Sequence, residues 1–329
     1  MSNLKPHKIV AIGDIHGDYY RLLRILHEQE IFIPGKLEWN PKANVDLVLL
    51  GDYVDWRGEP MEGAPEEWPT NIKRLLELIM FICDETEQLN KESPGFTGRV
   101  HTLMGNHDRM MLDSFKILSR LSPFIGNMIL KRSDSGQIPF LAKLFNTLTG
   151  HEDMEDLLRV MNWYEQGGEM TINAYGGMQQ WMDAMNGELG SFIANRLKLG
   201  VLLYGRLFVH SIPDNPDHWI PLHELSKLPQ LTYESVIEGF TWGRRLWGVN
   251  IITGGKVLPF TQEEIEEFLK RMNAEKVFVG HTPFYRTGPF FAYKGKVVDL
   301  DTHAVPGSSP YVEEMLLCHK LYEINCEGD

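Results

Sequence analysis

Cysteine is scarce in this sequence, with three residues among 329, and none of the three belongs to a CxxC pair. This scarcity argues against a disulfide framework and against a cysteine-ligated structural zinc site. Long apolar runs are missing as well, and none approaches the roughly 20 residues that cross a bilayer as a helix. The polar N-terminal segment leads directly into a short apolar run, unlike a secretory signal peptide. We therefore expect a cytoplasmic protein without a membrane partner.

Positive charge is also in deficit, because 32 Lys and Arg residues stand against 45 Asp and Glu residues, for a formal net charge of −13. Proteins that bind long nucleic acids rely on clustered Lys and Arg, so we expect no such partner. A phosphorylated protein or a nucleotide is compatible with this charge, since bound divalent cations reverse the sign of the local field. Nothing in the sequence predicts an oligomeric state.

Five short apolar runs each end in polar residues. The runs span residues 8–17, 45–52, 99–108, 206–211 and 276–282. Each is typical of a buried strand, and helical periodicity at 19–29 and 71–88 separates the first three runs. A capping-box pattern at Thr261 and Glu264 predicts a further helix. Strands that alternate with helices indicate an α/β fold.

Two parts of the sequence depart from this alternation. Residues from about 110 to 204 contain many apolar side chains at helical spacing but no strong strand pattern. We interpret them as a helical insertion that caps the site. Residues 290–302 and 312–325 are typical of β-hairpins, so a second, more antiparallel sheet is expected near the C-terminus.

The polar residues at the five strand ends form one chemical set. They are Asp14, His16, Asp52, Asn106, His107, His210 and His281. Ligands bind in the crevice at the carboxyl ends of strands in open α/β sheets, so these residues converge if the strands share sheets. Carboxylate and imidazole ligands suit Mn, Fe, Co or Zn, and seven groups exceed what one ion requires. Two ions about 3.5–4 Å apart would clamp an in-line displacement at phosphorus.

Each piece of this set has a purely structural interpretation when it is considered alone. The GDIHG segment is compatible with a turn and a helix cap, Asn106 with an N-cap, and His210 with a hydrogen-bonded core histidine. Five strand ends that all finish in ligand-type residues are difficult to obtain from packing alone. The combination therefore favours a metal site.

The motifs GDIHG, GDYVDWRG, GNHD, a strand-end His and GH resemble those of the calcineurin-like metallophosphoesterase superfamily. They are similar in particular to its phosphoprotein phosphatase branch, which includes bacterial protein phosphatases and symmetrical diadenosine tetraphosphatases. GGEMTINAYG, TWGRR, GHTPF and VVDLDT extend the resemblance from about residue 8 to 304. It implies a single domain over residues 1–329, built as a four-layer α/β/β/α sandwich of two mixed sheets with a helical cap insertion at about 110–204.

The resemblance also implies six ligands for two divalent metal ions, which would be Mn, with Fe or Zn as alternatives. The six are Asp14, His16, Asp52, Asn106, His210 and His281. Asp14 and His16 would hold the first ion, Asp52 would bridge both ions, and the other three would hold the second.

Two further pairs of residues receive roles from the resemblance. His107, oriented by Asp55, would protonate the leaving oxygen while a hydroxide between the two metals attacks phosphorus. Arg57 and Arg244 would bind the phosphate oxygens, with Arg245 as the alternative to Arg244. The family places the arginine directly after the aspartate, whereas Trp56 intervenes here, so the contact of Arg57 departs from the family pattern.

Several residues keep two interpretations at this point. Arg109 could reach phosphate or lie on a helix surface, His303 could be a ligand or make a structural hydrogen bond, and Trp56 could pack under the cap or stack on a base. The insertion aromatics could likewise stack on bases or form a core. These aromatics are Trp163, Tyr164, Tyr175 and Trp181. The remaining histidines of interest, His101, His151 and His223, are interpreted as ordinary residues.

The reaction expected from the resemblance is hydrolysis of a phosphoester, with a Ser/Thr protein phosphatase as the first interpretation. A diadenosine tetraphosphatase or another nucleotide or small-molecule phosphatase is the alternative. A non-catalytic scaffold is a third possibility, and the complete set of ligands and the general acid argue against it.

Overall fold

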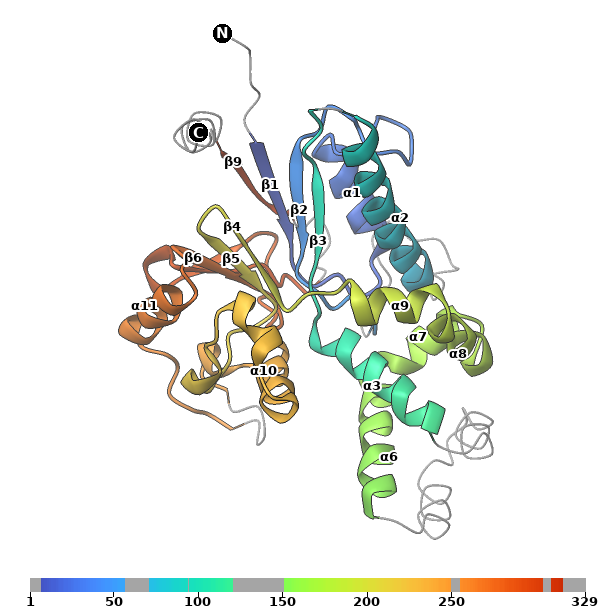
Figure 1. Ribbon diagram of the computed structural model, residues 1–329, viewed down its shortest axis with the longest axis vertical. Coiled ribbons are helices and arrows are strands. Elements are labelled where there is room, and N and C mark those ends of the chain that lie inside the picture. Colours follow the sequence, from blue (N-terminus) through green and yellow to red (C-terminus); the bar gives the residue numbers. More distant parts are fainter. Residues whose placement is uncertain are drawn as a thin grey trace.

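The structure is a computed structural model that describes residues 7–56, 71–93, 95–120, 151–249, 255–303 and 309–315. The first of its two sheets has the strand order β3-β2-β1-β9 (Figure 1). Its strands are β1 (His7–Ile12), β2 (Val45–Leu49), β3 (Arg99–Thr102) and β9 (Tyr311–Met315). The first three run parallel, and β9 pairs antiparallel with β1.

The second sheet has the strand order β4-β5-β6-β8-β7. Its strands are β4 (Gly200–Leu203), β5 (Arg206–Val209), β6 (Lys276–Val279), β7 (Phe290–Ala292) and β8 (Val297–Asp299). The central strands β5, β6 and β8 run parallel, and an antiparallel pair lies at each edge. Both sheets are therefore mixed, as the resemblance implies.

Side-chain alternation along the strands divides the apolar core into layers. Ile9 and Ala11 of β1 pack in the same cluster as Phe208 of β5, between the two sheets. The intervening Val10 and Ile12 pack in the cluster that contains the helices α1 and α2. The central strands are thus buried on both faces, which explains why they are continuous apolar runs rather than alternating ones.

Helices cover the outer face of each sheet. The helices α1 (Tyr19–Glu28) and α2 (Asn71–Glu92) lie on the first sheet, and α10 (Gln230–Trp242) and α11 (Gln262–Arg271) lie on the second (Figure 1). The order helix, sheet, sheet, helix confirms the predicted four-layer α/β/β/α sandwich.

The local elements that the sequence predicts are present. The five apolar runs form β1, β2, β3, β5 and β6, and residues 290–302 contain the antiparallel pair of β7 and β8. Thr261 caps α11, because its Oγ1 accepts a hydrogen bond from the Glu264 N–H while the Glu264 carboxylate accepts one from the Thr261 N–H.

The prediction that residues 312–325 belong to the second sheet is wrong for the part that is described. Residues Tyr311–Met315 form the single strand β9, which pairs with β1 in the first sheet. Local alternation predicts a strand here, but it contains no information on the partner, which depends on where the chain returns in space. The residues after Met315 lie outside the described part of the chain.

The described part of the stretch between β3 and β4 consists mainly of helices, and the last of them ends at Asn195, before β4. Its elements are α3 (Asn106–Arg120), α6 (His151–Trp163), a π-helical turn (Tyr164–Gly168), α7 (Glu169–Ala174), α8 (Met178–Asn186) and α9 (Glu188–Asn195). These helices gather on one side of the sandwich (Figure 1).

The remaining described helices are short 3-10 turns. They span Pro216–His218, Leu222–Lys227, Arg245–Trp247 and Tyr293–Gly295. Among the helices that the structure describes, none has the length and apolar character that crossing a membrane requires.

Candidate metal centre

The carboxyl ends of β1, β2, β3, β5 and β6 bring the predicted ligand residues together between the two sheets. Four of the residues at these ends have a left-handed backbone conformation, with φ of 46° at His16, 50° at Asp52, 65° at Asp55 and 70° at His281. Each such conformation costs about 1–3 kcal/mol in a residue other than glycine. Backbone strain of this kind is concentrated at functional sites, where it turns side chains in a direction that a regular strand would not allow.

The carboxylate of Asp52 lies between histidines from both sheets. Its Oδ2 is 3.8 Å from Nε2 of His16, which follows β1, and 3.5 Å from Nε2 of His210, which follows β5. Its Oδ1 accepts a hydrogen bond of 2.9 Å from the His107 N–H at the start of α3. This central position is the one that a bridging carboxylate requires.

Asn106 and two histidines form the part of the centre that faces the second sheet. Oδ1 of Asn106 lies 2.8 Å from Nδ1 of His281 and 3.1 Å from Nε2 of His210. Ligand atoms of Asp52, His210 and His281 lie within 4.8 Å of one another, close enough to share one ion. A second such group consists of His16, Asp52 and His107.

The orientation of two histidines is set by backbone carbonyls. Nδ1 of His210 donates to the Leu50 carbonyl oxygen at 2.9 Å, and Nδ1 of His16 donates to the Val54 carbonyl oxygen at 2.9 Å. Because a carbonyl oxygen can only accept, each Nδ1 carries a proton, and each Nε2 is the ring nitrogen that faces Asp52. Metal-binding histidines in proteins are commonly held in this way.

Asp14 lies at the second-sheet side of the centre rather than in either three-residue group. Its two oxygens accept hydrogen bonds from the His281 N–H at 3.1 and 3.0 Å, and its Oδ1 is 3.9 Å from Nδ1 of His210. The expected pairing of Asp14 with His16 at the first ion stays a prediction.

The electrostatics of the centre favour a bound cation. Burial and repulsion from Asp301 and Asp52 raise the pKa of Asp14 well above its usual range. Burial and the neighbouring His107 lower the pKa of His16 to about 4, so this imidazole is neutral at pH 7. Buried carboxylates that repel one another and neutral imidazoles are the donor set that a divalent ion stabilises. The residues present therefore fit the implied metals.

The predicted acid and its orienting carboxylate are in contact. Nδ1 of His107 donates to Oδ2 of Asp55 at 2.9 Å, so Asp55 fixes the orientation of the ring and Nε2 lies on its other side. Two groups of the insertion complete the shell of Asp55: Nε1 of Trp163 donates to Oδ2 at 2.8 Å, and Oγ1 of Thr171 donates to Oδ1 at 2.6 Å. Burial raises the pKa of Asp55, although the hydrogen bonds from His107, Thr171 and Trp163 act against this increase.

Trp163 and Thr171 are site residues that sequence reasoning did not identify. Both belong to segments that were singled out, Trp163 as one of the insertion aromatics and Thr171 within GGEMTINAYG. Neither signal specified a hydrogen bond to Asp55, because that contact joins residues 108 and 116 positions apart.

A glycine allows the insertion to approach Asp55. Gly167 has φ of 110°, and a Cβ at this position would lie 3.0 Å from the backbone carbonyl carbon and the Cβ of Asp55. A Cβ at the adjacent Gly168 would lie 2.5 Å from the ring of Trp163. The Gly-Gly pair is thus explained by close packing on both sides.

Asp108 is a third missed residue, and it organises the backbone of the centre. Its Oδ2 accepts from the Asp52 N–H at 2.8 Å and the Gly105 N–H at 3.0 Å, and its Oδ1 accepts from the Tyr53 N–H at 3.0 Å. Burial and repulsion from Asp52 raise the pKa of Asp108 to about 7. The only sequence signal for Asp108 was its position as the last residue of the GNHD motif.

Arg244 is the predicted phosphate-binding arginine that the structure places at the centre, where its Nε donates to Nε2 of His281 at 3.0 Å. Arg57 lies outside the described residues. The alternative, Arg245, is engaged elsewhere, because it forms an ion pair with Glu264 at 2.8 Å and stacks over the ring of Phe260.

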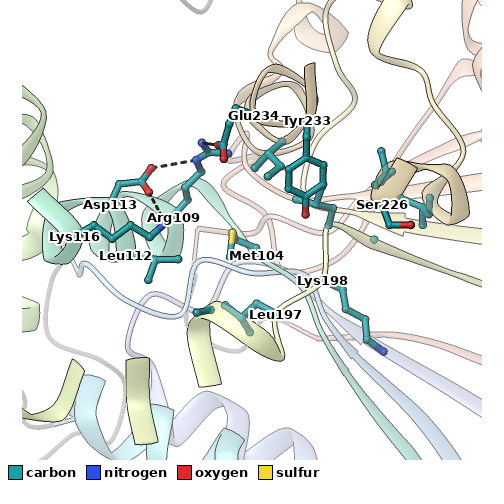
Figure 2. A pocket seen from close by; sticks show the side chains of 16 residues that line it. Met104, Arg109, Leu112, Asp113, Lys116, Leu197, Lys198, Ser226, Tyr233 and Glu234 are labelled. Carbon is teal, nitrogen blue, oxygen red and sulfur yellow. Dashed lines mark hydrogen bonds and ion pairs between the residues drawn. The ribbon is translucent and has the colours of Figure 1, made fainter. Parts of the chain in front are cut away.

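Arg109 pairs with Asp113 within α3 and joins α3 to α10 through its ion pair with Glu234. Its Nε is 3.3 Å from Asp113, and its Nη2 donates to Glu234 at 2.7 Å (Figure 2). It lines a pocket of about 500 Å³ whose wall includes Tyr233 and Lys198 (Figure 2). Of its two interpretations, the structural one agrees with these contacts.

His303 and Trp56 make contacts that agree with their structural interpretations. The backbone N–H of His303 donates to Asp301 at 2.8 Å, and its ring lies 4.8 Å from that of Tyr285. Trp56 is 8% exposed and packs in the core of the first sheet. Trp181 is buried as well, which agrees with a core role rather than base stacking.

The three other histidines have separate outcomes. His101 is not isolated, because its Nε2 lies 2.9 Å from Oδ1 of the buried Asp46. His223 is exposed and lies 3.7 Å from Glu224. The side chain of His151 lies outside the described part of the structure.

A two-sheet sandwich with buried carboxylates and imidazoles at its strand ends is an arrangement that suits a metal-dependent hydrolase. The family model of the calcineurin-like phosphoesterases matches residues 7–285, which is most of the sequence. The chain therefore belongs to the calcineurin-like phosphoesterase family. No curated protein gives a significant match.

Solved structures share this fold at low sequence identity. A cold-active protein tyrosine phosphatase is 19% identical with a TM-score of 0.57, and the alignment covers 93% of this chain and 73% of that chain. A cold-active protein-tyrosine phosphatase of a psychrophile, Shewanella sp., is 18% identical with a TM-score of 0.52, covering 93% and 74%. At these identities the likeness concerns the fold alone.

Proposed function

We propose that this chain is a phosphatase that hydrolyses phosphoserine or phosphothreonine in protein substrates and depends on two divalent ions, Mn or alternatively Fe or Zn. The observation that carries the proposal is the His107–Asp55 pair beside the donor set centred on Asp52. Bound ions would neutralise charge on the phosphate oxygens and supply an activated water.

The residues of the chain then have distinct tasks. The scissile phosphate lies near the N-terminus of α3, where the helix dipole favours an anion. Nε2 of His107 gives its proton to the leaving oxygen, and Asp55 holds the imidazole ring in place. The guanidinium of Arg244 leaves Nε2 of His281 and binds non-bridging oxygens of the phosphate.

The choice of a protein substrate over a dinucleoside polyphosphate is supported by the insertion. Trp163 and Trp181 are fully buried with rings 5.1 Å apart, so neither offers a face to a base. A diadenosine tetraphosphatase or another nucleotide phosphatase stays the alternative. Phosphotyrosine joins the substrates to be tested because the two solved structures above are named as tyrosine phosphatases.

The test is hydrolysis by metal-stripped protein after Mn²⁺ is added back. The substrates are p-nitrophenyl phosphate, phosphothreonine and phosphotyrosine peptides, and diadenosine tetraphosphate. We expect Mn²⁺-dependent hydrolysis with a preference for a phosphopeptide. We expect His107→Asn to lower kcat for the phosphothreonine peptide by about 10²–10⁴-fold. The loss on p-nitrophenyl phosphate should be smaller, because nitrophenolate departs without protonation.

Two results would count against this proposal. Absence of hydrolysis with Mn²⁺, Fe²⁺ and Zn²⁺ would remove the enzyme interpretation. An equal loss on both leaving groups in His107→Asn would remove the role of His107 as the general acid.

A further inference from the structure

A groove of about 270 Å³ lies beside the metal centre, between α3, α6 and α10. Its wall on α10 includes Trp242, whose ring meets that of His281 edge-on at 5.7 Å. Its wall on α3 includes Met110, one helical turn after His107. The groove therefore begins where the substrate phosphate would bind, and we call it the flanking groove.

One cation and one anion are available in the flanking groove. Arg109 and Asp113 also line it, but Arg109 is already paired with Asp113 and Glu234 (Figure 2). Arg159 on α6 and Glu238 on α10 are exposed, and within the described residues neither side chain has an ion pair or hydrogen bond. The two free charges come from opposite walls, one from the insertion and one from the sandwich.

The charge and size of the groove select among phosphorylated ligands. The additional phosphates of a dinucleoside polyphosphate would need an excess of cations, whereas the groove has as many carboxylates as guanidinium groups. Its volume is also below the range of about 300–1,000 Å³ that is typical of pockets enclosing a whole small molecule. A short stretch of polypeptide, with amides beside charged side chains, suits these walls, which also contain the Asn162 amide.

We propose that the flanking groove holds the residues next to the phosphorylated side chain of a protein substrate. Arg159 and Glu238 would select these residues by the charge of their side chains. Arg159 would contact an acidic flanking side chain, and Glu238 would contact a basic one. This inference rests on the proposed phosphatase function and adds the rule by which its peptide substrates are selected.

The test uses the full-length protein and phosphothreonine peptides that differ only in the residues flanking the phosphothreonine, either Glu or Lys. We expect Arg159→Glu to lower kcat/KM for Glu-flanked peptides by roughly threefold to tenfold and to raise it for Lys-flanked ones. Glu238→Lys should have the opposite effect and lower kcat/KM for Lys-flanked peptides. Hydrolysis of p-nitrophenyl phosphate, which has no flanking residues, should stay unchanged in both variants.

Arg271→Glu is the matched control, because Arg271 is an exposed arginine on α11 that does not line the groove. It should leave every substrate unchanged. Unaltered discrimination between Glu- and Lys-flanked peptides in both groove variants would overturn the inference, and so would a preference of the wild type for diadenosine tetraphosphate. Absence of Mn²⁺-dependent p-nitrophenyl phosphate hydrolysis in the wild type would instead overturn the proposed function. The two failures are therefore distinguishable.

Discussion

Several residues of the metal centre combine a left-handed backbone with a largely buried side chain. Asp52 shows the consequence of this arrangement most clearly. Burial disfavours its charge, but the nearby His210 and His107 lower its pKa well below the usual range. The carboxylate is thus kept ionised at the point where two histidines from different sheets meet it. A position with this charge and these neighbours suits a bridging ligand better than a structural turn residue.

A separate ionic cluster at the other end of the first sheet allows a test of stability against pH. Asp46 of β2 lies between His7 and His101, with contacts of 2.6 and 2.9 Å. Burial acts against the carboxylate, but hydrogen bonds from His101 and His7 outweigh it and lower the pKa of Asp46. A folded-state pKa below the unfolded value contributes stability above about pH 4, and this stability is lost as the pH falls further.

Asp46→Asn should therefore lower the free energy of unfolding by about 1–3 kcal/mol at pH 7, and the difference should shrink on acidification below about pH 4. Urea unfolding from pH 7 to pH 3 measures both quantities. Asp183→Asn is the control, since Asp183 is an exposed carboxylate on α8. A deficit that grows at acid pH would show that the pKa of Asp46 is shifted in the other direction.

At the scale of elements, the insertion contributes to the catalytic pair as well as to the shape of the protein. The end of α6 and the start of α7 supply two hydrogen bonds to Asp55, and Gly167 brings the turn between them to within contact of its backbone. The position of Asp55, and through it the orientation of His107, depends on how this turn packs.

Gly167→Ala tests this dependence. A methyl group there meets Asp55 at 3.0 Å in addition to the cost of a positive φ. Gly35→Ala is the matched control, because Gly35 has φ of 74° but no atom within 4 Å of the added Cβ. We expect the control to lose about 1 kcal/mol of stability and Gly167→Ala to lose more, with a lower kcat on the phosphothreonine peptide. Thermal unfolding measures the loss of stability, and kcat measures the effect on catalysis. Equal stability and equal kcat in the two variants would refute the role of this turn.

At the scale of the whole molecule, the centre joins the two sheets. Asp14 and His281 are 267 positions apart and in direct hydrogen-bond contact, and Asp52 of the first sheet faces His210 of the second. Ions bound here would bind the folded chain alone, because the ligands are dispersed once the sheets separate.

Adding Mn²⁺ to the metal-stripped protein should therefore raise Tm by about 5 °C or more at concentrations far above Kd. Asp52→Asn should abolish most of this increase, since it removes the shared carboxylate. Ca²⁺, which prefers oxygen ligands, is the control ion and should have a smaller effect. An equal Tm increase for the variant would place the binding site elsewhere.

Much of the fold and of the centre could be predicted from local patterns. The strand runs that end at Asp14, Asp52 and Asn106, and the capping box at Thr261, are written within windows of about ten residues, which is the range over which period and capping act. The family resemblance then implied the four-layer order that the structure confirms. The pairing of β9 with β1 was missed, because alternation specifies a strand and a face but not a neighbour.

The chemistry of the strand ends was determined by the sequence alone, since a carboxylate or an imidazole is a potential ligand wherever it is placed. The tertiary structure decided which groups share a position. It joined Asp55 to Trp163 and Thr171, and it directed Arg244 toward His281 but Arg245 toward Glu264. These outcomes depend on contacts across more than one element, where burial and the geometry of packing select one partner among many that local sequence allows.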